Sequence, residues 1–333
     1  MIMKKFIVSP APHIHSDQST QSLMIDVIIA LVPTLAVSIY AFGFSAIQLV
    51  LIGVATCALT EYLIEKFIMH SEITIKDCSA IVTGLLLALN MPPSSPWWLI
   101  LIGSFMAIAV GKMTYGGIGQ NIFNPAIFGR VFLLVSFPVY MTDWSIPQAW
   151  LNAGKIDAVT GPTPLSMVRD GLAAGQTVPQ IFAANNFNQL DKLFINIGGS
   201  VGEISAIALV LGFIYLLIRR VIKPTIPLTI LITIFVFTGI FWLIDPLHHT
   251  SPIFNIFTGG VLIGAIFMAT DYVTSPMTFR GQVIYGVGIG VITVLIRLFG
   301  SYPEGVSFAI LIMNGIVPLL NKYIKPARYA KGA

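Results

Sequence analysis

Long apolar stretches dominate this chain and limit what it can fold into. Seven of them occupy residues 23–42, 44–64, 97–113, 204–221, 226–243, 283–299 and 306–323. A helix needs about 20 mainly apolar residues to cross the hydrocarbon core of a membrane, and these stretches are of that length. Inside that core every backbone N–H and C=O group must find a partner, which a helix provides within itself. The stretches therefore predict an all-α polytopic membrane protein.

The composition excludes several classes of soluble protein. Of the 333 residues, 56% are hydrophobic and only 10% are Asp, Glu, Lys or Arg, whereas soluble domains carry about 25% charged residues. A soluble enzyme, a nucleic-acid-binding domain and a disordered scaffold are thereby ruled out. The two cysteines, Cys57 and Cys78, form no CxxC pair, so we expect no disulfide framework, metal site or iron–sulfur cluster held by this chain.

The distribution of basic residues predicts ten crossings. Segments 79–91, 124–139 and 254–270 are apolar but short or interrupted, and they raise the number of spans to ten. With a cytoplasmic N-terminus, ten spans place most Lys and Arg residues on the cytoplasmic side, as the positive-inside rule expects. We expect no secretory signal peptide. We also expect a multi-pass protein of the cell inner membrane with both termini in the cytoplasm. The basic residues left on the outer side are Arg130, Lys155, Arg169, Lys192 and Arg297.

The short segments indicate an internal repeat. TGLLLALNMPPSSP (83–96) resembles IGAIFMATDYVTSP (263–276), since each has an apolar half-helix, a polar break and then Ser-Pro. Five spans on either side of a central loop give two inverted five-helix repeats with broken half-helices, a design typical of transporters. The predicted organisation is a cytoplasmic N-terminal segment (1–21), a first membrane repeat (22–139), an extracytoplasmic loop (140–200), a second membrane repeat (201–323) and a cytoplasmic tail (324–333).

Polar groups collect at the breaks. Asn90, the run GGIGQN ending at Asn121, and Asp271 offer amides, freed carbonyls and one carboxylate. Such groups suit a small cation or a flat aromatic ligand. The alternative is that the glycines only allow close helix packing and that Asn and Asp only cap half-helices. Because carboxylates inside a membrane are expensive and often functional, Asp271 is the candidate residue for an ion pathway.

The central loop contains DAVTGPTPL, which begins at Asp157 and includes Thr160, Gly161 and Thr163. By composition alone this is a turn whose Gly and Pro residues set the backbone. The motif also resembles the flavinylation signature D-x-x-S/T-G-A-T of two related membrane proteins. These are the D component of the Rnf electron-transport complex and the B component of the sodium-translocating NADH:quinone oxidoreductase.

Three further segments resemble that family in the same order. They are SPAPHIHS (9–16), GGIGQNIFNPAIFGRVFLL (116–134) and ATDYVTSPMT (269–278). The short N-terminal segment is more similar to the Rnf component. Two positions depart from the family pattern, because Pro162 stands where Ala is usual and Tyr272 stands where Pro is common.

The resemblance implies a function for the chain and for its loop. Thr163 would carry FMN through a phosphoester made by a separate flavin transferase, with Asp157, Thr160 and Gly161 as the other motif positions. The chain would be a non-catalytic membrane subunit of a ferredoxin:NAD oxidoreductase that exports sodium ions or protons. Partner subunits would handle ferredoxin and NAD. A second flavin, noncovalent riboflavin, would lie near Asn121 and Asn124.

Three alternatives stay open at this stage. The chain could be the B-like component of the quinone-reducing relative. It could also be a solute transporter or channel without flavin, since inverted repeats fit that class equally well. A membrane protein that only anchors redox partners would hold no cofactor and would tolerate Thr163→Ala.

Overall fold

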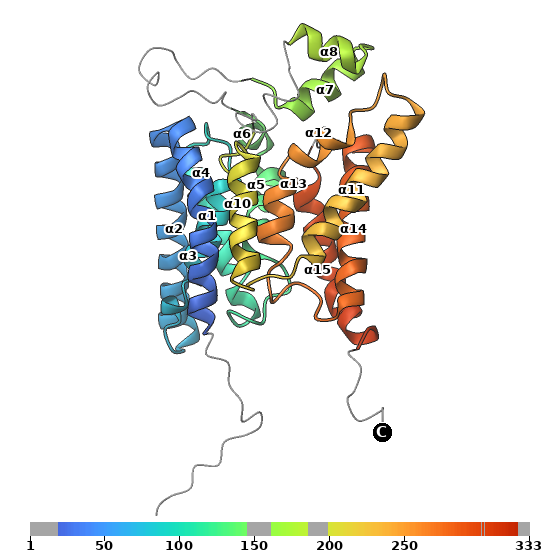
Figure 1. Ribbon diagram of the computed structural model, residues 1–333. Helices are drawn as coiled ribbons and strands as arrows, with labels where there is room; N and C mark the ends of the chain where they lie inside the picture. The colour runs from blue at the N-terminus through green and yellow to red at the C-terminus, as the bar shows by residue number, and fades with distance from the viewer. Residues whose placement is uncertain (1–18, 145–160, 186–198, 301, 303, 326–333) are drawn as a thin grey trace, which may run out of the picture.

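The computed structural model describes residues 19–144, 161–185, 199–300, 302 and 304–325 (Figure 1). Every regular element within these ranges is a helix, and most of the helices run side by side in one bundle. Six are long and apolar enough to cross a membrane, and shorter apolar helices lie among them. The predicted all-α polytopic membrane fold is therefore confirmed.

Helices account for all ten apolar segments that the sequence predicts to cross. The six long spans are built from α1 (Thr20–Phe42), α2 (Phe44–Leu63) with the π-helical η1 (Ile64–Met69), α4 (Trp97–Ala109) continuing to η3 (Met113–Tyr115), α11 (Thr225–Ile244), α14 (Phe279–Phe299) and α15 (Val306–Tyr323). The shorter apolar helices are α3 (Ser79–Leu89), which follows the 3-10 turn η2 (Ile75–Asp77), α5 (Pro125–Ser136) and α10 (Ala206–Ile218). The remaining segment is interrupted and consists of α12 (Pro252–Phe257), α13 (Val261–Ile263) and the π-helical η5 (Gly264–Met268).

Three short helices lie at the upper end of Figure 1, namely α6 (Pro138–Met141), α7 (Pro164–Ala173) and α8 (Val178–Ala184). The start of α1 and the end of α15 lie at the opposite end. Buried Val168 and Val178 fix α7 and α8 to each other and to Phe254 of α12. The start of α7 is thereby held over one end of the bundle. Which side of the membrane this is stays a prediction.

The two halves of the bundle pack in the same order. Helix α2 packs on α3 and α4, and α11 packs correspondingly on η5 and α14. Helix α5 packs on α4 as α15 packs on α14, while α1 contacts α10 and α5 contacts α15 across the middle. Helix α1 runs upward in Figure 1 and α10 runs downward. This arrangement is what two repeats of opposite orientation require.

Each interrupted helix ends for an identifiable reason, and its freed backbone groups find partners. Helix α3 stops before Pro92 and Pro93, which lack the N–H that would continue it. The peptide N–H of Gly202 donates to the Leu89 carbonyl at 2.6 Å, and that of Val201 donates to the Met91 carbonyl at 3.0 Å. Non-helical backbone at this depth is thus covered by the other half of the protein, as burial in an apolar layer demands.

Helices α1 and α10 approach each other closely at a glycine. Gly212 of α10 lies so near the Ala30 carbonyl of α1 that an added Cβ would collide with it. We expect Gly212→Ala to lower the free energy of unfolding by about 1–3 kcal/mol through overpacking. Gly239 of α11 is the matched control, because a Cβ there would make an ordinary 3.4 Å contact with Pro252. Thermal unfolding of the purified variants in detergent would measure the difference, and equal melting temperatures would contradict this prediction.

Candidate functional site

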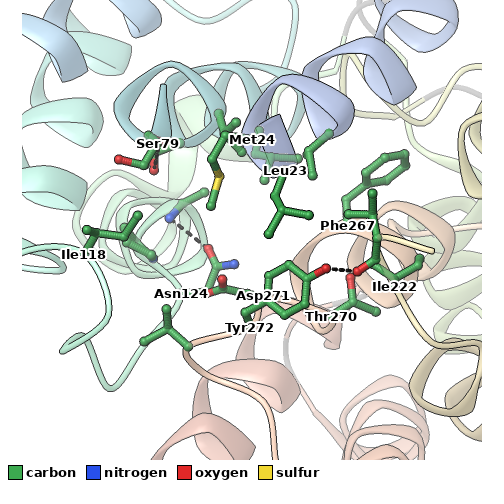
Figure 2. Close-up of a pocket in the computed structure, with 18 of the residues that line it drawn as sticks. Leu23, Met24, Ser79, Ile118, Asn124, Ile222, Phe267, Thr270, Asp271 and Tyr272 are labelled. Carbon is green, nitrogen blue, oxygen red and sulfur yellow. Dashed lines mark hydrogen bonds between the residues drawn. The ribbon is translucent and has the colours of Figure 1, made fainter. Parts of the chain in front are cut away.

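Two cavities open at opposite ends of the contact between the halves. The upper cavity has a volume of about 580 Å³ and lies between α5, α6, the start of α7 and the segment that leads into α15. The lower cavity is much smaller, about 90 Å³, and lies among the ends of α1, α3, α4 and η5 (Figure 2). The sequence-predicted site residues divide between these two places.

Thr163 lies beside the upper cavity at the N-cap of α7. Its hydroxyl oxygen accepts a hydrogen bond from the Ser166 backbone N–H at 3.1 Å, and its O–H donates to the Ser166 hydroxyl at 3.0 Å. Pro164 occupies the first helical position, where its missing N–H is not needed. Thr163 itself is 5% exposed, and its neighbours Pro162 and Ser166 line the cavity.

The other motif positions are only partly within the described residues. Gly161 lines the upper cavity, and its N–H donates to the Trp144 carbonyl at 2.9 Å. Asp157 and Thr160 lie outside the described residues. The structure therefore places Gly161 and Pro162 at the wall of the upper cavity and Thr163 directly beside it, and the first part of the motif stays a prediction.

The walls of the upper cavity combine aromatic and charged side chains. Trp144, Tyr302 and Phe308 supply flat apolar surface, and the rings of Tyr302 and Phe308 lie 5.2 Å apart at 33°. Arg130 and Arg169 supply positive charge, and Asp143, Asp170 and Glu304 supply negative charge. A cavity of this size, with apolar surface and several charged groups, can hold a small organic ligand.

Arg130 is the charged group that is most deeply buried in this wall. It comes from the middle of α5, is 3% exposed and forms an ion pair with Glu304. Its second terminal nitrogen donates to the Asn90 amide oxygen at 2.7 Å. Its Nε–H has no hydrogen-bond partner among the described residues.

A second arginine, which is half-buried, binds backbone carbonyls near Thr163. Arg297 of α14 donates to the carbonyls of Asn255 at 2.6 Å, Thr258 at 2.7 Å and Glu304 at 3.0 Å. It thereby ties α12 to the segment before α15. Thr163 shares a narrow recess with the carboxylates of Glu203 and Glu304. The flavin-motif residue thus stands against a buried network of charged side chains.

Sequence reasoning missed this network. Arg130 and Arg297 are interpreted there as basic residues on the outer side of the membrane, whereas the structure buries Arg130 in the wall of the upper cavity and holds Arg297 half-buried against α12. The available signal was an arginine in the interior of an apolar segment. Such a residue is rarely tolerated without a partner and a role.

The lower cavity brings together the remaining predicted residues. Asn121, Asn124 and Asp271 come from distant parts of the sequence and line one space (Figure 2). Asn124 caps α5 by accepting from the N–H groups of Ala126 and Ile127, and its amide donates to the Met268 carbonyl at 3.2 Å. The capping interpretation of this asparagine and the cavity interpretation therefore both hold.

Asp271 lies where the chain leaves η5. Its carboxylate accepts a hydrogen bond from the Thr274 hydroxyl at 3.1 Å. Lys112 also lines the lower cavity, and its ammonium donates to both oxygens of Glu61 at 2.7 and 2.8 Å and to Ser79 at 2.6 Å. The cavity thus holds a carboxylate and two amides, which are groups that suit a small cation, and one lysine whose charge is paired with Glu61.

The riboflavin that the resemblance implies near Asn121 and Asn124 stays a prediction. Pockets for small organic ligands have volumes of about 300–1,000 Å³, and the lower cavity has about 90 Å³. A second flavin at this place would need the surrounding helix ends to move apart.

No group of three or more His, Cys, Asp or Glu residues gathers as a set of metal ligands in the part of the chain that the structure describes.

Comparison with known proteins supplies relatives over almost the whole length. The family model described as NQR2, RnfD, RnfE matches residues 7–330. The chain is 44% identical to the D component of the Na(+)-translocating ferredoxin:NAD(+) oxidoreductase complex of Acetobacterium woodii, with 97% of this chain and 94% of that protein covered. It is 41% identical to the D component of the proton-translocating ferredoxin:NAD(+) oxidoreductase complex of Clostridium ljungdahlii, with 97% and 96% covered. It is 39% identical to the D component of the ion-translocating oxidoreductase complex of Aliivibrio salmonicida, with 97% and 98% covered.

The ion pair between Lys112 and Glu61 is buried beside the lower cavity. Lys112→Met leaves Glu61, which is fully buried, without its partner, and we expect a loss of about 3–5 kcal/mol in the free energy of unfolding. The double variant Glu61→Gln/Lys112→Met removes both charges and should regain most of that loss. Lys66→Met, at an exposed lysine, is the control and should change the stability by less than about 0.5 kcal/mol. Thermal unfolding in detergent measures all three, and a double variant as unstable as Lys112→Met would contradict the prediction.

Proposed function

This chain belongs to the NQR2, RnfD, RnfE family, and on that premise we propose that it is the D-type membrane subunit of a redox-driven ion pump, with FMN covalently attached at Thr163. The complex would be of the ferredoxin:NAD oxidoreductase type. This chain would carry electrons through its flavin and contribute to the path of the pumped ion.

The observation that carries the flavin proposal is the position of Thr163. It lies beside a cavity of about 580 Å³ that is lined by Gly161, Pro162 and Ser166. A phosphoester on its hydroxyl would tether the ligand at the cavity mouth. The attachment residue and a space of suitable size are thus found together, although nothing in the hydrophobic pattern of the sequence requires it.

The N-terminus of α7 suits the phosphate of such a link. Thr163 is the N-cap of this ten-residue helix, whose first N–H groups have no partner within the helix. A negative charge at this place is favoured by the helix dipole and by those free N–H groups. Attachment would displace the hydrogen bond that the Ser166 N–H now donates to the hydroxyl, and the phosphate oxygens would accept in its place.

The cavity wall suits the ring system. Trp144, Tyr302 and Phe308 offer surfaces on which a flat aromatic ligand can stack, and Arg130 offers positive charge. When bound, FMN supplies the chemistry of one- and two-electron transfer. The chain's own residues place the ring, exclude water from it and set the charge around it.

The lower cavity is the proposed station for the ion. Asp271 offers a carboxylate to one small space that Asn121 and Asn124 also line, and a carboxylate suits a sodium ion or a carried proton. One of the relatives above is named for sodium and another for protons. The proposal therefore covers both cations.

Other proteins would supply the remaining steps. Ferredoxin and NAD would be handled by other subunits of the complex, and a separate flavin transferase would load Thr163. We place both termini of the chain in the cytoplasm and α7 on the outer side of the inner membrane, in line with the distribution of basic residues.

Peptide mass spectrometry tests the flavin proposal. We expect the mass of FMN on the peptide that contains Thr163, and we expect Thr163→Ala to abolish both this mass and the flavin fluorescence of the denatured protein in a gel. Thr163→Ser should retain modification, because it keeps the acceptor hydroxyl and the cap. Thr177→Ala is the matched control, since Thr177 is the N-cap of the neighbouring helix α8.

The proposal fails if wild-type Thr163 carries no flavin in a host that has an active flavin transferase. In that case a transporter or an anchoring membrane protein would be the better interpretation. Flavin on another residue of the loop would overturn the assignment of Thr163 while leaving the chain a flavoprotein.

A further inference from the structure

Arg130 is a buried arginine in the middle of the apolar helix α5, and one of its three side-chain nitrogens has no partner among the described residues. A guanidinium in the middle of an apolar helix is expensive, and it is tolerated when every donor is paired. Two of its nitrogens are paired, one with Glu304 and one with the Asn90 amide oxygen at 2.7 Å. The third, Nε, has no partner among the described residues although the side chain is only 4% exposed. A buried donor without a partner destabilises the folded protein.

The pairing of Arg130 fixes it rigidly in the cavity wall. Asn90 belongs to the end of α3 in the first half, and Glu304 belongs to the segment before α15 in the second half. The guanidinium is therefore held from both halves and cannot swing away. Groups held in this way are suited to position a ligand, because they need no reorganisation when it binds.

Glu304 is the carboxylate paired with Arg130, while the charge of Glu203 also acts on the arginine and Asp143 and Asp170 line the same cavity. Glu304 forms the ion pair and also lines the upper cavity, and its side chain is 15% exposed where that of Arg130 is 4% exposed. A ligand in the cavity therefore meets a cation and its counter-ion together. The strength of the positive field at the ligand depends on how far Glu304 neutralises the arginine.

We propose that Arg130 is a positioning residue for the flavin of the upper cavity, with its positive charge beside the ring edge that becomes negative on reduction, and that Glu304 sets how much of that charge the ring meets. This inference rests on the proposed function. It adds to it a residue that holds the ring and a residue that adjusts its reduction potential.

The two residues act on the potential in opposite directions. A cation beside the ring stabilises the added negative charge, so Arg130→Gln lowers the midpoint potential of the flavin. Glu304→Gln removes the counter-charge and raises the potential. A merely structural role of the ion pair would shift both variants in the same direction, because each would loosen the same contact.

The test is a spectroelectrochemical titration of the purified full-length chain, after mass spectrometry has shown flavin on Thr163 in each variant. We expect Arg130→Gln to lower the equilibrium constant for flavin reduction at least tenfold. For a two-electron couple this corresponds to a fall of about 30 mV in the midpoint potential. We expect Glu304→Gln to give a rise of similar size. Arg130→Lys, which keeps the charge, should recover most of the wild-type potential.

Two further variants guard against misfolding and indirect effects. Arg130→Gln leaves Glu304 unpaired, so the double variant Arg130→Gln/Glu304→Gln removes both charges, and its potential should lie between those of the single variants. Arg219→Gln breaks another Arg–carboxylate pair, with Asp26 at the opposite end of the bundle, and should leave the potential unchanged.

Flavin on Thr163 with potentials that match the Arg219→Gln control, or that move in the same direction in both single variants, would overturn this inference and leave the proposed function standing. Absence of flavin from wild-type Thr163 would overturn both.

Discussion

Where a helix is interrupted inside an apolar layer, the backbone N–H and C=O groups at the break need hydrogen-bond partners. The rest of this structure depends on how the breaks after α3 and η5 obtain those partners. The end of η5 is held by side chains of the other half, because Asn124 donates to the Met268 carbonyl and Asn90 donates to the Met268 sulfur at 3.5 Å. The end of α3 is held by the peptide N–H groups of Val201 and Gly202. Each half therefore supplies hydrogen-bond partners to the interrupted helix of the other half, as an apolar layer requires.

The interruptions also decide where the cavities are. Half-helices that stop within the bundle leave space beyond their ends, and polar side chains collect there because freed backbone groups need them. Asn90 connects the two places, since it caps α3, contacts Met268 near the lower cavity and accepts from Arg130 in the wall of the upper one. The upper cavity gains its charged wall from α5, α7 and the segment before α15, and its aromatic wall from Trp144, Tyr302 and Phe308. Thr163 stands at its edge because the N-cap of α7 is placed there.

Much of this arrangement could be predicted from the sequence, and the remainder depends on docking of the halves. Segment length and hydrophobicity predict the ten helical segments, and the polar breaks predict that Asn121, Asn124 and Asp271 share a space. The pairing of Arg130 with Glu304 could not be predicted, because the two are separated by 174 positions and meet only when the repeats pack. The volume of the lower cavity could not be predicted from the sequence either. A riboflavin near Asn121 and Asn124 would need a wider space than this cavity offers. Asp157 and Thr160 lie outside the described residues, and their part in the motif stays a prediction.

A flavin attached to Thr163 and seated in the upper cavity is the proposal that connects these features. An experimental structure of the purified chain, loaded by its flavin transferase, tests this most directly. We predict continuous density from the Thr163 hydroxyl oxygen through a phosphate at the N-terminus of α7 to a ring beside Arg130, between Trp144 and Tyr302. Density that leads from Thr163 away from this cavity, or a cavity filled only by solvent while the flavin is present by mass, would contradict it.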